Sequence, residues 1–362
     1  MPSPVTQTLL ISLALFGAST LAQAADTSSD ESAPDWQAIN LAVTDTQVLP
    51  AYAAFAASTA DLVPPAEQLC AAPAADSLAA MQEAFHPAMD AWQSIQHIHF
   101  GPVTYFNWNF RIQYWPDERS SGARQLDALL ASEDLDALQL ANFARQSVGV
   151  QGFPALERLL FEDSALQQVQ ASPYRCALIS AIAANLADMA MGVQQRWRDE
   201  FRATVADEEG QDYYESARDA GVDFYKALVE TLRKNQEQKL VPVLGANPAE
   251  LRLRRAESWR AERSLRNLRL NLQALNALYQ GSNPALADAL PEADRHQVAE
   301  AFAVLLDSSK DLPDGMAGFA DTAAGHAQLQ SVVEHMAVLY EALEAGLKNT
   351  DLYLGFNSLD GD

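Results

Sequence analysis

Basic residues are scarce in this chain. Its 362 residues include 24 Lys and Arg against 48 Asp and Glu, which gives a formal net charge of −24 at pH 7. Proteins that bind nucleic acid or anionic lipid draw much of their affinity from cations that neutralise phosphates. The composition therefore argues against a nucleic-acid partner and against adsorption to a membrane surface, and it favours attraction for cations.

Long apolar runs are also few. The first, Leu9–Phe16, is too short to remain in a bilayer, and Ala22-Gln23-Ala24 behind it fits the small-x-small pattern of a cleavage site. We therefore predict a signal peptide at 1–24, a flexible mature N-terminus at 25–35 and a periplasmic or envelope location. A buried N-terminal helix is the alternative. We expect no transmembrane segment in the rest of the chain.

Only two cysteines occur, Cys70 and Cys176. An exported protein matures in an oxidising compartment, where such a pair forms a disulfide. A metal site built on two distant thiols is the weaker alternative, because no second Cys or His lies beside either residue. We predict an intramolecular Cys70–Cys176 disulfide that staples the first half of the chain.

Several catalytic motifs are missing as well. The sequence has no Gly-x-Ser-x-Gly elbow, no glycine-rich phosphate loop and no His-Glu-x-x-His zinc motif. Nucleophilic catalysis and nucleotide chemistry therefore have no support from the sequence. The chain also has no Cys-x-x-Cys-His attachment site for haem.

Apolar residues recur at helical spacing along most of the chain, and no run alternates as strands do. Two such series are Met81, Phe85, Ala88, Trp92 and Ile95, and Leu329, Val332, Met336, Leu339 and Leu343. We predict an all-α fold of two helical-bundle domains, at 36–204 and 205–362.

A weak internal repeat suggests that the two bundles arose by duplication. Asp90-Ala91-Trp92 in the first half has a counterpart in Glu257-Ser258-Trp259 of the second, which we also place in a helix. Chance similarity between amphipathic helices is the alternative explanation.

The segment Gly152–Phe161 has the pattern of a helix start. Glycine ends the preceding segment, and Pro154 suits a first helical turn. Glu157 lies in or near that turn, where the helix dipole stabilises a carboxylate. From these residues alone, a helix entry with favourable charge is the simplest interpretation.

Four stretches give this chain a resemblance to the imelysin-like family of exported bacterial proteins. They are the 152–161 segment, the Trp115-Pro116-Asp117 turn, the Ser264–Leu268 helix and the tail Leu354–Asp362. The resemblance implies an all-helical fold of two bundles and an association with iron-regulated uptake. Some members of the family are classed as metallopeptidases, which is the only enzyme class that we consider for this chain.

The best-known motif of that family is Gly-x-His-x-x-Glu, whose His and Glu face the same way on a helix. This chain has a Gly-x-Pro-x-x-Glu variant, in which Gly152 and Glu157 match and Pro154 replaces the histidine. Because proline has no ligand atom, only Glu157 carries over as a metal ligand. This replacement weakens the peptidase interpretation further.

Other residues offer further candidates. Glu83, His86, Asp90 and His97 fit one helical stripe, which we interpret as a solvated face rather than a metal site. An aromatic loop at 100–115 fits either a ligand pocket or a cap on a bundle. Arginines 252, 255, 263 and 266 share a predicted helix face with Trp259, either as an anion site or paired with nearby carboxylates.

Together these patterns predict a periplasmic protein that binds iron or an iron compound, including haem, with envelope uptake proteins as partners. The predicted ligand-binding residues are Gly152, Pro154, Glu157, Trp115, Asp117 and Arg263, with Glu157 as the metal ligand. A metallopeptidase-like enzyme and a non-catalytic interaction module with a vestigial site are the alternatives.

Overall fold

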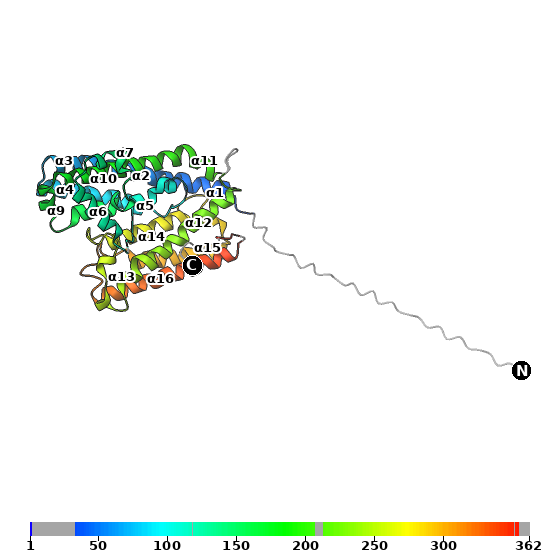
Figure 1. Ribbon diagram of the computed structural model, residues 1–362. Helices are drawn as coiled ribbons and strands as arrows, with labels where there is room; N and C mark the ends of the chain where they lie inside the picture. Colours follow the sequence, from blue (N-terminus) through cyan, green and yellow to red (C-terminus); the bar gives the residue numbers. More distant parts are fainter. Residues whose placement is uncertain (2–32, 118, 207–212, 351, 355–362) are drawn as a thin grey trace. The chain divides into compact units, whose positions relative to one another are not determined.

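The computed structural model describes residues 1, 33–117, 119–206, 213–350 and 352–354 (Figure 1). Residues 2–24 of the predicted signal peptide and residues 25–32 of the predicted flexible segment lie outside the described residues. The same holds for all but the first residue of the tail motif at 354–362.

The all-α prediction is confirmed, because every regular element in the described ranges is a helix and none is a strand. The α-helices are α1 Trp36–Val43, α2 Leu49–Ala60, α3 Val63–Ala71, α4 Ala75–Gln93, α5 Trp108–Ile112, α6 Ser121–Ser132, α7 Leu140–Phe143, α8 Phe153–Phe161, α9 Ala165–Ala171, α10 Pro173–Arg196, α11 Arg202–Val205, α12 Ala217–Lys234, α13 Val241–Leu244, α14 Ser264–Gln280, α15 Glu292–Ser309 and α16 Ala323–Lys348.

Three long helical stretches contain a π-helical turn, at Thr44–Val48, Trp197–Phe201 and Asn235–Leu240. The third connects α12 to α13 and carries Lys239, whose side chain is buried. A π-turn inserts one extra residue into a helix and so changes the direction in which the following side chains point. It is a common feature of functional sites.

The helices pack in two groups along the chain (Figure 1). In the first, α10 packs on α2 and α3, and α4 packs on α2, α3 and α8. In the second, α12 packs on α14 and α16, while α15 and α16 lie along each other. The groups meet where α4 contacts α14 and where α1 contacts α12, and residues 34–362 form one compact unit.

The predicted disulfide is present: Cys70 and Cys176 are bonded, with a Cα–Cα distance of 5.3 Å. It joins α3 to α10. The continuous helical stretch Pro173–Val205, which contains α10, is long and apolar enough to span a membrane by length and composition. However, 56% of its most apolar window is buried inside the protein, and a core helix meets the same criterion.

The division into domains at residue 205 stays a prediction. The chain passes there from α11, which ends at Val205, to α12, which begins at Ala217. One argument for duplication is wrong, because Glu257–Trp259 lies in turns before α14 rather than in a helix. Duplication itself stays a prediction.

Candidate functional site

The start of α8 is fixed by close contact between two backbones. A Cβ atom added to Gly152 would lie 2.1 Å from the carbonyl oxygen of Ile112 and 2.2 Å from that of Arg111. Only glycine fits such an approach. Pro154 occupies the first turn of α8, where its missing N–H costs no helical hydrogen bond. The predicted helix start is confirmed.

Glu157 lies on the buried side of α8, with 5% of its surface exposed. Its Oε1 accepts hydrogen bonds from the backbone N–H groups of Arg260, at 2.9 Å, and Ala261, at 3.1 Å. These donors, more than 100 residues along the chain, stabilise the carboxylate rather than the first turn of α8, which has no acidic residue. Burial raises the pKa of Glu157 to about 7, against the opposing effect of these bonds and of the Arg260 charge.

A buried ion pair, Lys239 with Glu257, lies between the two helix groups. The Nζ–Oε2 distance is 2.7 Å, and the side chains are only 4% and 2% exposed. Burial lowers the pKa of Lys239 to about 8, against the effect of Glu257. Burial alone would raise the pKa of Glu257, but the charge and hydrogen bonds of Lys239 lower it overall. Both groups are therefore charged at neutral pH.

Amide side chains complete this polar cluster. Lys239 Nζ also donates to Gln93 Oε1 at 3.1 Å and to Asn271 Oδ1 at 2.6 Å. Gln113 and Asn267 donate to the two oxygens of Glu257, at 2.6 and 2.9 Å. With every polar group bonded, the cluster holds α4, the π-turn before α13 and α14 in one arrangement.

Arg263 joins α14 to α4 at the edge of this cluster. It is 1% exposed, donates to His86 Nδ1 at 2.9 Å, and pairs with Asp90. Arg266 also pairs with Asp90 and, at 3.3 Å, with Asp314. The interpretation of His86 and Asp90 as part of a solvated stripe is therefore wrong, because both side chains bond to Arg263 at the start of α14. For Arg263 and Arg266 the structure shows pairing with carboxylates.

Trp115 and Asp117 lie in the loop before α6. Asp117 accepts hydrogen bonds from the backbone of Ser121, at 2.7 Å, and of Ala123, at 3.3 Å, and so stabilises the start of α6. Trp115 is half-buried and follows Gln113, whose side chain reaches Glu257. A role for Trp115 and Asp117 in ligand binding stays a prediction.

The arginine-rich segment before α14 is not the predicted helix. Leu253–Arg255 is a short 3₁₀ turn, and α14 begins only at Ser264. Arg254 and Arg260 both face the ring of Trp259, with guanidinium carbons 5.8 and 4.4 Å from its centroid. We call these three residues the arginine–tryptophan face. Through the backbone of Arg260 this face adjoins Glu157.

The residues around Glu157 do not fit a bare metal ion. No group of three or more His, Cys, Asp or Glu side chains that could hold one occurs in the described part of the chain. Pro154 supplies no ligand atom, and one oxygen of Glu157 is already bonded to two N–H groups. A divalent or ferric ion needs at least four donors in a closed protein site.

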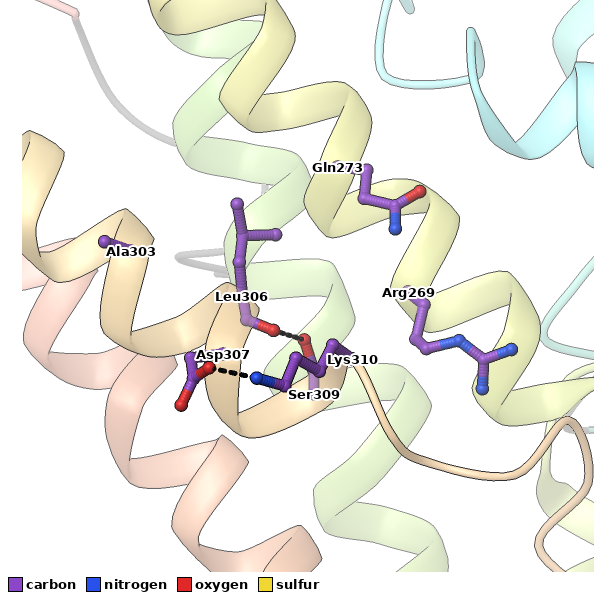
Figure 2. A pocket seen from close by; sticks show the side chains of 7 residues that line it. All are labelled: Arg269, Gln273, Ala303, Leu306, Asp307, Ser309 and Lys310. Atoms are coloured by element: carbon purple, nitrogen blue, oxygen red, sulfur yellow. Dashed lines mark hydrogen bonds and ion pairs between the residues drawn. The ribbon is translucent and has the colours of Figure 1, made fainter.

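A pocket of about 310 Å³ lies elsewhere, between α14 and α15 (Figure 2). The polar residues that line it are Arg269, Gln273, Asp307, Ser309 and Lys310. Lys310 pairs with Asp307, and Arg269 donates to the carbonyl of Pro313 at 2.8 Å. Its cations are thus engaged within the protein, and none of the predicted ligand-binding residues lines it.

Sequence reasoning missed the Lys239–Glu257 cluster. Lys239 stands beside an apolar stretch, Leu240–Leu244, which is the one signal that pointed to burial. The amide partners of the ion pair, Gln93 and Asn271 for Lys239 and Gln113 for Glu257, are spread over about 180 residues of sequence, and no local pattern brings them together.

Comparisons with known proteins agree with this fold. The family model described as Imelysin, of the M75 peptidases, matches residues 48–345. An imelysin-like protein from Psychrobacter arcticum 273-4 superposes with a TM-score of 0.71 at 22% identity, over 89% of this chain and 97% of that one. A protein assigned as an iron-regulated protein A precursor, from Parabacteroides distasonis ATCC 8503, gives 0.71 at 13% identity, over 88% and 96%.

One curated relative is similar in sequence. "Iron-regulated protein A" of Synechococcus elongatus is 25% identical over 243 residues, which are 66% of this chain and 62% of that protein. The chain thus spans less than two thirds of that relative's length.

Proposed function

Because this chain belongs to the imelysin family, we propose that it binds iron or an iron compound outside the cytoplasm and passes it to uptake proteins of the cell envelope. The name of the Synechococcus relative, an iron-regulated protein, supports a link to iron. The precursor from Parabacteroides supports export, in agreement with the signal peptide predicted at residues 1–24. The net charge of −24 favours the approach of cations.

One observation carries the choice of site. Glu157 occupies the acidic position of the family motif and is buried where α8 meets the segment before α14. Its Oε2 has no hydrogen-bond partner among the residues that the structure describes, whereas Oε1 is held by two N–H groups. A carboxylate fixed through one oxygen presents the other in a constant direction, as a ligand or a hydrogen-bond acceptor does.

Gly152 and Pro154 have a supporting role in this proposal. They set the position of α8 against the carbonyl groups of Arg111 and Ile112, and so the position of Glu157. Arg263 holds α14 against α4 through Asp90. These residues act on the site by positioning it rather than by donating to iron.

The test is a titration of the exported, metal-stripped protein with ferrous and ferric iron, zinc, copper and haem, followed by calorimetry. Saturable binding of an iron species that Glu157→Gln weakens at least tenfold supports the site. The matched control is Glu67→Gln, an exposed glutamate of α3. If no iron species binds, iron binding itself is refuted. If iron binds to Glu157→Gln as it does to wild type, the assignment of the site to Glu157 is refuted.

A peptidase activity is the competing proposal that the family name raises. Hydrolysis by a metallopeptidase needs a metal with an open position, an activated water and a general base. Glu157 is a single carboxylate and cannot by itself provide the other protein ligands that such a metal needs. We therefore expect no chelator-sensitive cleavage of peptide libraries. Cleavage that disappears with chelator and with Glu157→Gln would favour the enzyme instead.

A further inference from the structure

The arginine–tryptophan face has an unusual charge for this protein. Residues 252–269 contain seven arginines and two glutamates, whereas the whole chain has twice as many acidic as basic residues. Arg263, Arg266 and Arg269 of this segment are paired with Asp90 and Asp314. The positive charge that remains is concentrated before α14.

Arg254 and Arg260 are two of the four arginines that carry this charge. Arg254 is exposed and Arg260 is half-buried. The contacts of their guanidinium groups are with the Trp259 ring, and neither has an ion pair within the described residues. Burial lowers the pKa of Arg260, and the charges of Arg158 and Arg254 act in the same direction against those of Glu157 and Glu162. The two cations of the face therefore lie near each other.

Such a pair is well suited to a carboxylate ligand. The guanidinium group presents a planar fork of N–H donors that matches a carboxylate with two parallel hydrogen bonds. Stacking on Trp259 holds both forks in place before the ligand arrives, which reduces the entropy lost on binding. The same two cations repel a bare metal ion.

The neighbouring Glu157 is held inside the protein. Its carboxyl is buried, and its Oε1 accepts hydrogen bonds from the backbone N–H groups of Arg260 and Ala261. The described residues around it supply too few donors to strip a metal of its other ligands. A metal that arrives with its own anionic ligands needs no further donors from these residues.

We infer that the arginine–tryptophan face binds iron as a multiply charged carboxylate chelate, through Arg254 and Arg260, rather than as a bare ion. This inference rests on the proposed function and specifies the chemical class of its ligand. The chelate's free carboxylates pair with the two arginines, which Trp259 holds in place.

The experiment compares four probes by calorimetry at low and high salt: ferric citrate with excess citrate, citrate alone, inorganic phosphate and ferrous iron. The variants are Arg254→Gln, Arg260→Gln and the double variant, with Arg145→Gln as the control because Arg145 is an exposed arginine outside this face. Thermal unfolding checks that each variant folds. We expect ferric citrate to bind best, each single variant to bind roughly tenfold more weakly and the double variant roughly a hundredfold. Salt should weaken binding further.

The outcomes separate this inference from the proposed function. Tight binding of ferrous iron without binding of ferric citrate overturns the inference and leaves iron binding in place. Ferric citrate that binds equally to the double variant also overturns it, because the ligand then occupies another site. Arginine-dependent binding of citrate or phosphate alone, with no preference for the iron complex, overturns the inference by showing a general anion site. It contradicts the proposed function as well only if ferrous iron also fails to bind.

Discussion

Glu157 offers a quantitative test of the site, because its burial has a calculable effect on stability. Its pKa lies at about 7 in the folded protein, against 4.5 for an ordinary glutamate. One pKa unit corresponds to about 1.4 kcal/mol, so the difference of 2.5 units corresponds to roughly 3 kcal/mol. Glu157 is 95% buried, so solvent screening reduces this figure little.

The sign follows from proton linkage. The folded protein holds a proton on Glu157 at pH values where the unfolded chain has released it. The contribution of Glu157 to stability is therefore fully present below pH 4.5 and is lost as the pH rises through about 7. Glu157→Gln removes the titration and keeps an oxygen that accepts from Arg260 and Ala261. We expect the variant to match wild type near pH 4.5 and to exceed its stability by roughly 3 kcal/mol at pH 8.

The assay is urea unfolding of both proteins from pH 4.5 to 8.5, with Glu67→Gln as the control for loss of one surface charge. Taking the difference between variant and wild type cancels the other titrating groups, including Lys239. A difference that stays constant with pH, or that has its midpoint near 4.5, would refute the buried environment described for Glu157.

Three further predictions concern the scaffold, each measured by denaturant unfolding. Lys239→Met should lower the free energy of unfolding by about 3–5 kcal/mol, because it leaves Glu257 charged and buried. Adding Glu257→Gln should restore part of that stability. An equal loss in the single and double variants would show that the pair is not coupled. Gly152→Ala should cost about 3 kcal/mol or more and weaken iron binding, since its Cβ overlaps the Ile112 carbonyl; wild-type stability would contradict this. Reduction of Cys70–Cys176 should cost about 4–5 kcal/mol, because the bond closes a loop of 106 residues, and an unchanged unfolding midpoint would contradict that estimate.

The fold class followed from the sequence because helical periodicity is a local property. Apolar spacing of three and four residues, as at Met81, Phe85 and Trp92, specifies one buried face whatever the partner helix is. The disulfide followed from the number of cysteines and the predicted compartment, since two thiols allow only one pairing. The helix start at Gly152 and Pro154 was equally local.

The same local reasoning failed for contacts between residues that are far apart in the sequence. Asp90 reads as a surface residue of α4 until Arg263 and Arg266 are brought to it from more than 170 residues away. The segment around Trp259 has helical spacing in sequence but forms turns, because Arg254 and Arg260 stack on the ring and Glu257 is drawn to Lys239. Local propensity is weak compared with these tertiary contacts.

The sequence by itself determined that this chain is helical, acidic and disulfide-linked, and it singled out Glu157, because composition, periodicity and cysteine number require no knowledge of distant neighbours. Only the tertiary structure decided what surrounds Glu157. It placed the N–H groups of Arg260 and Ala261 on its carboxylate, set the guanidinium groups of Arg254 and Arg260 against Trp259, and buried Lys239 against Glu257. Those environments depend on which helices meet, and charges in a low-dielectric interior are governed by their nearest partners rather than by their position in the sequence.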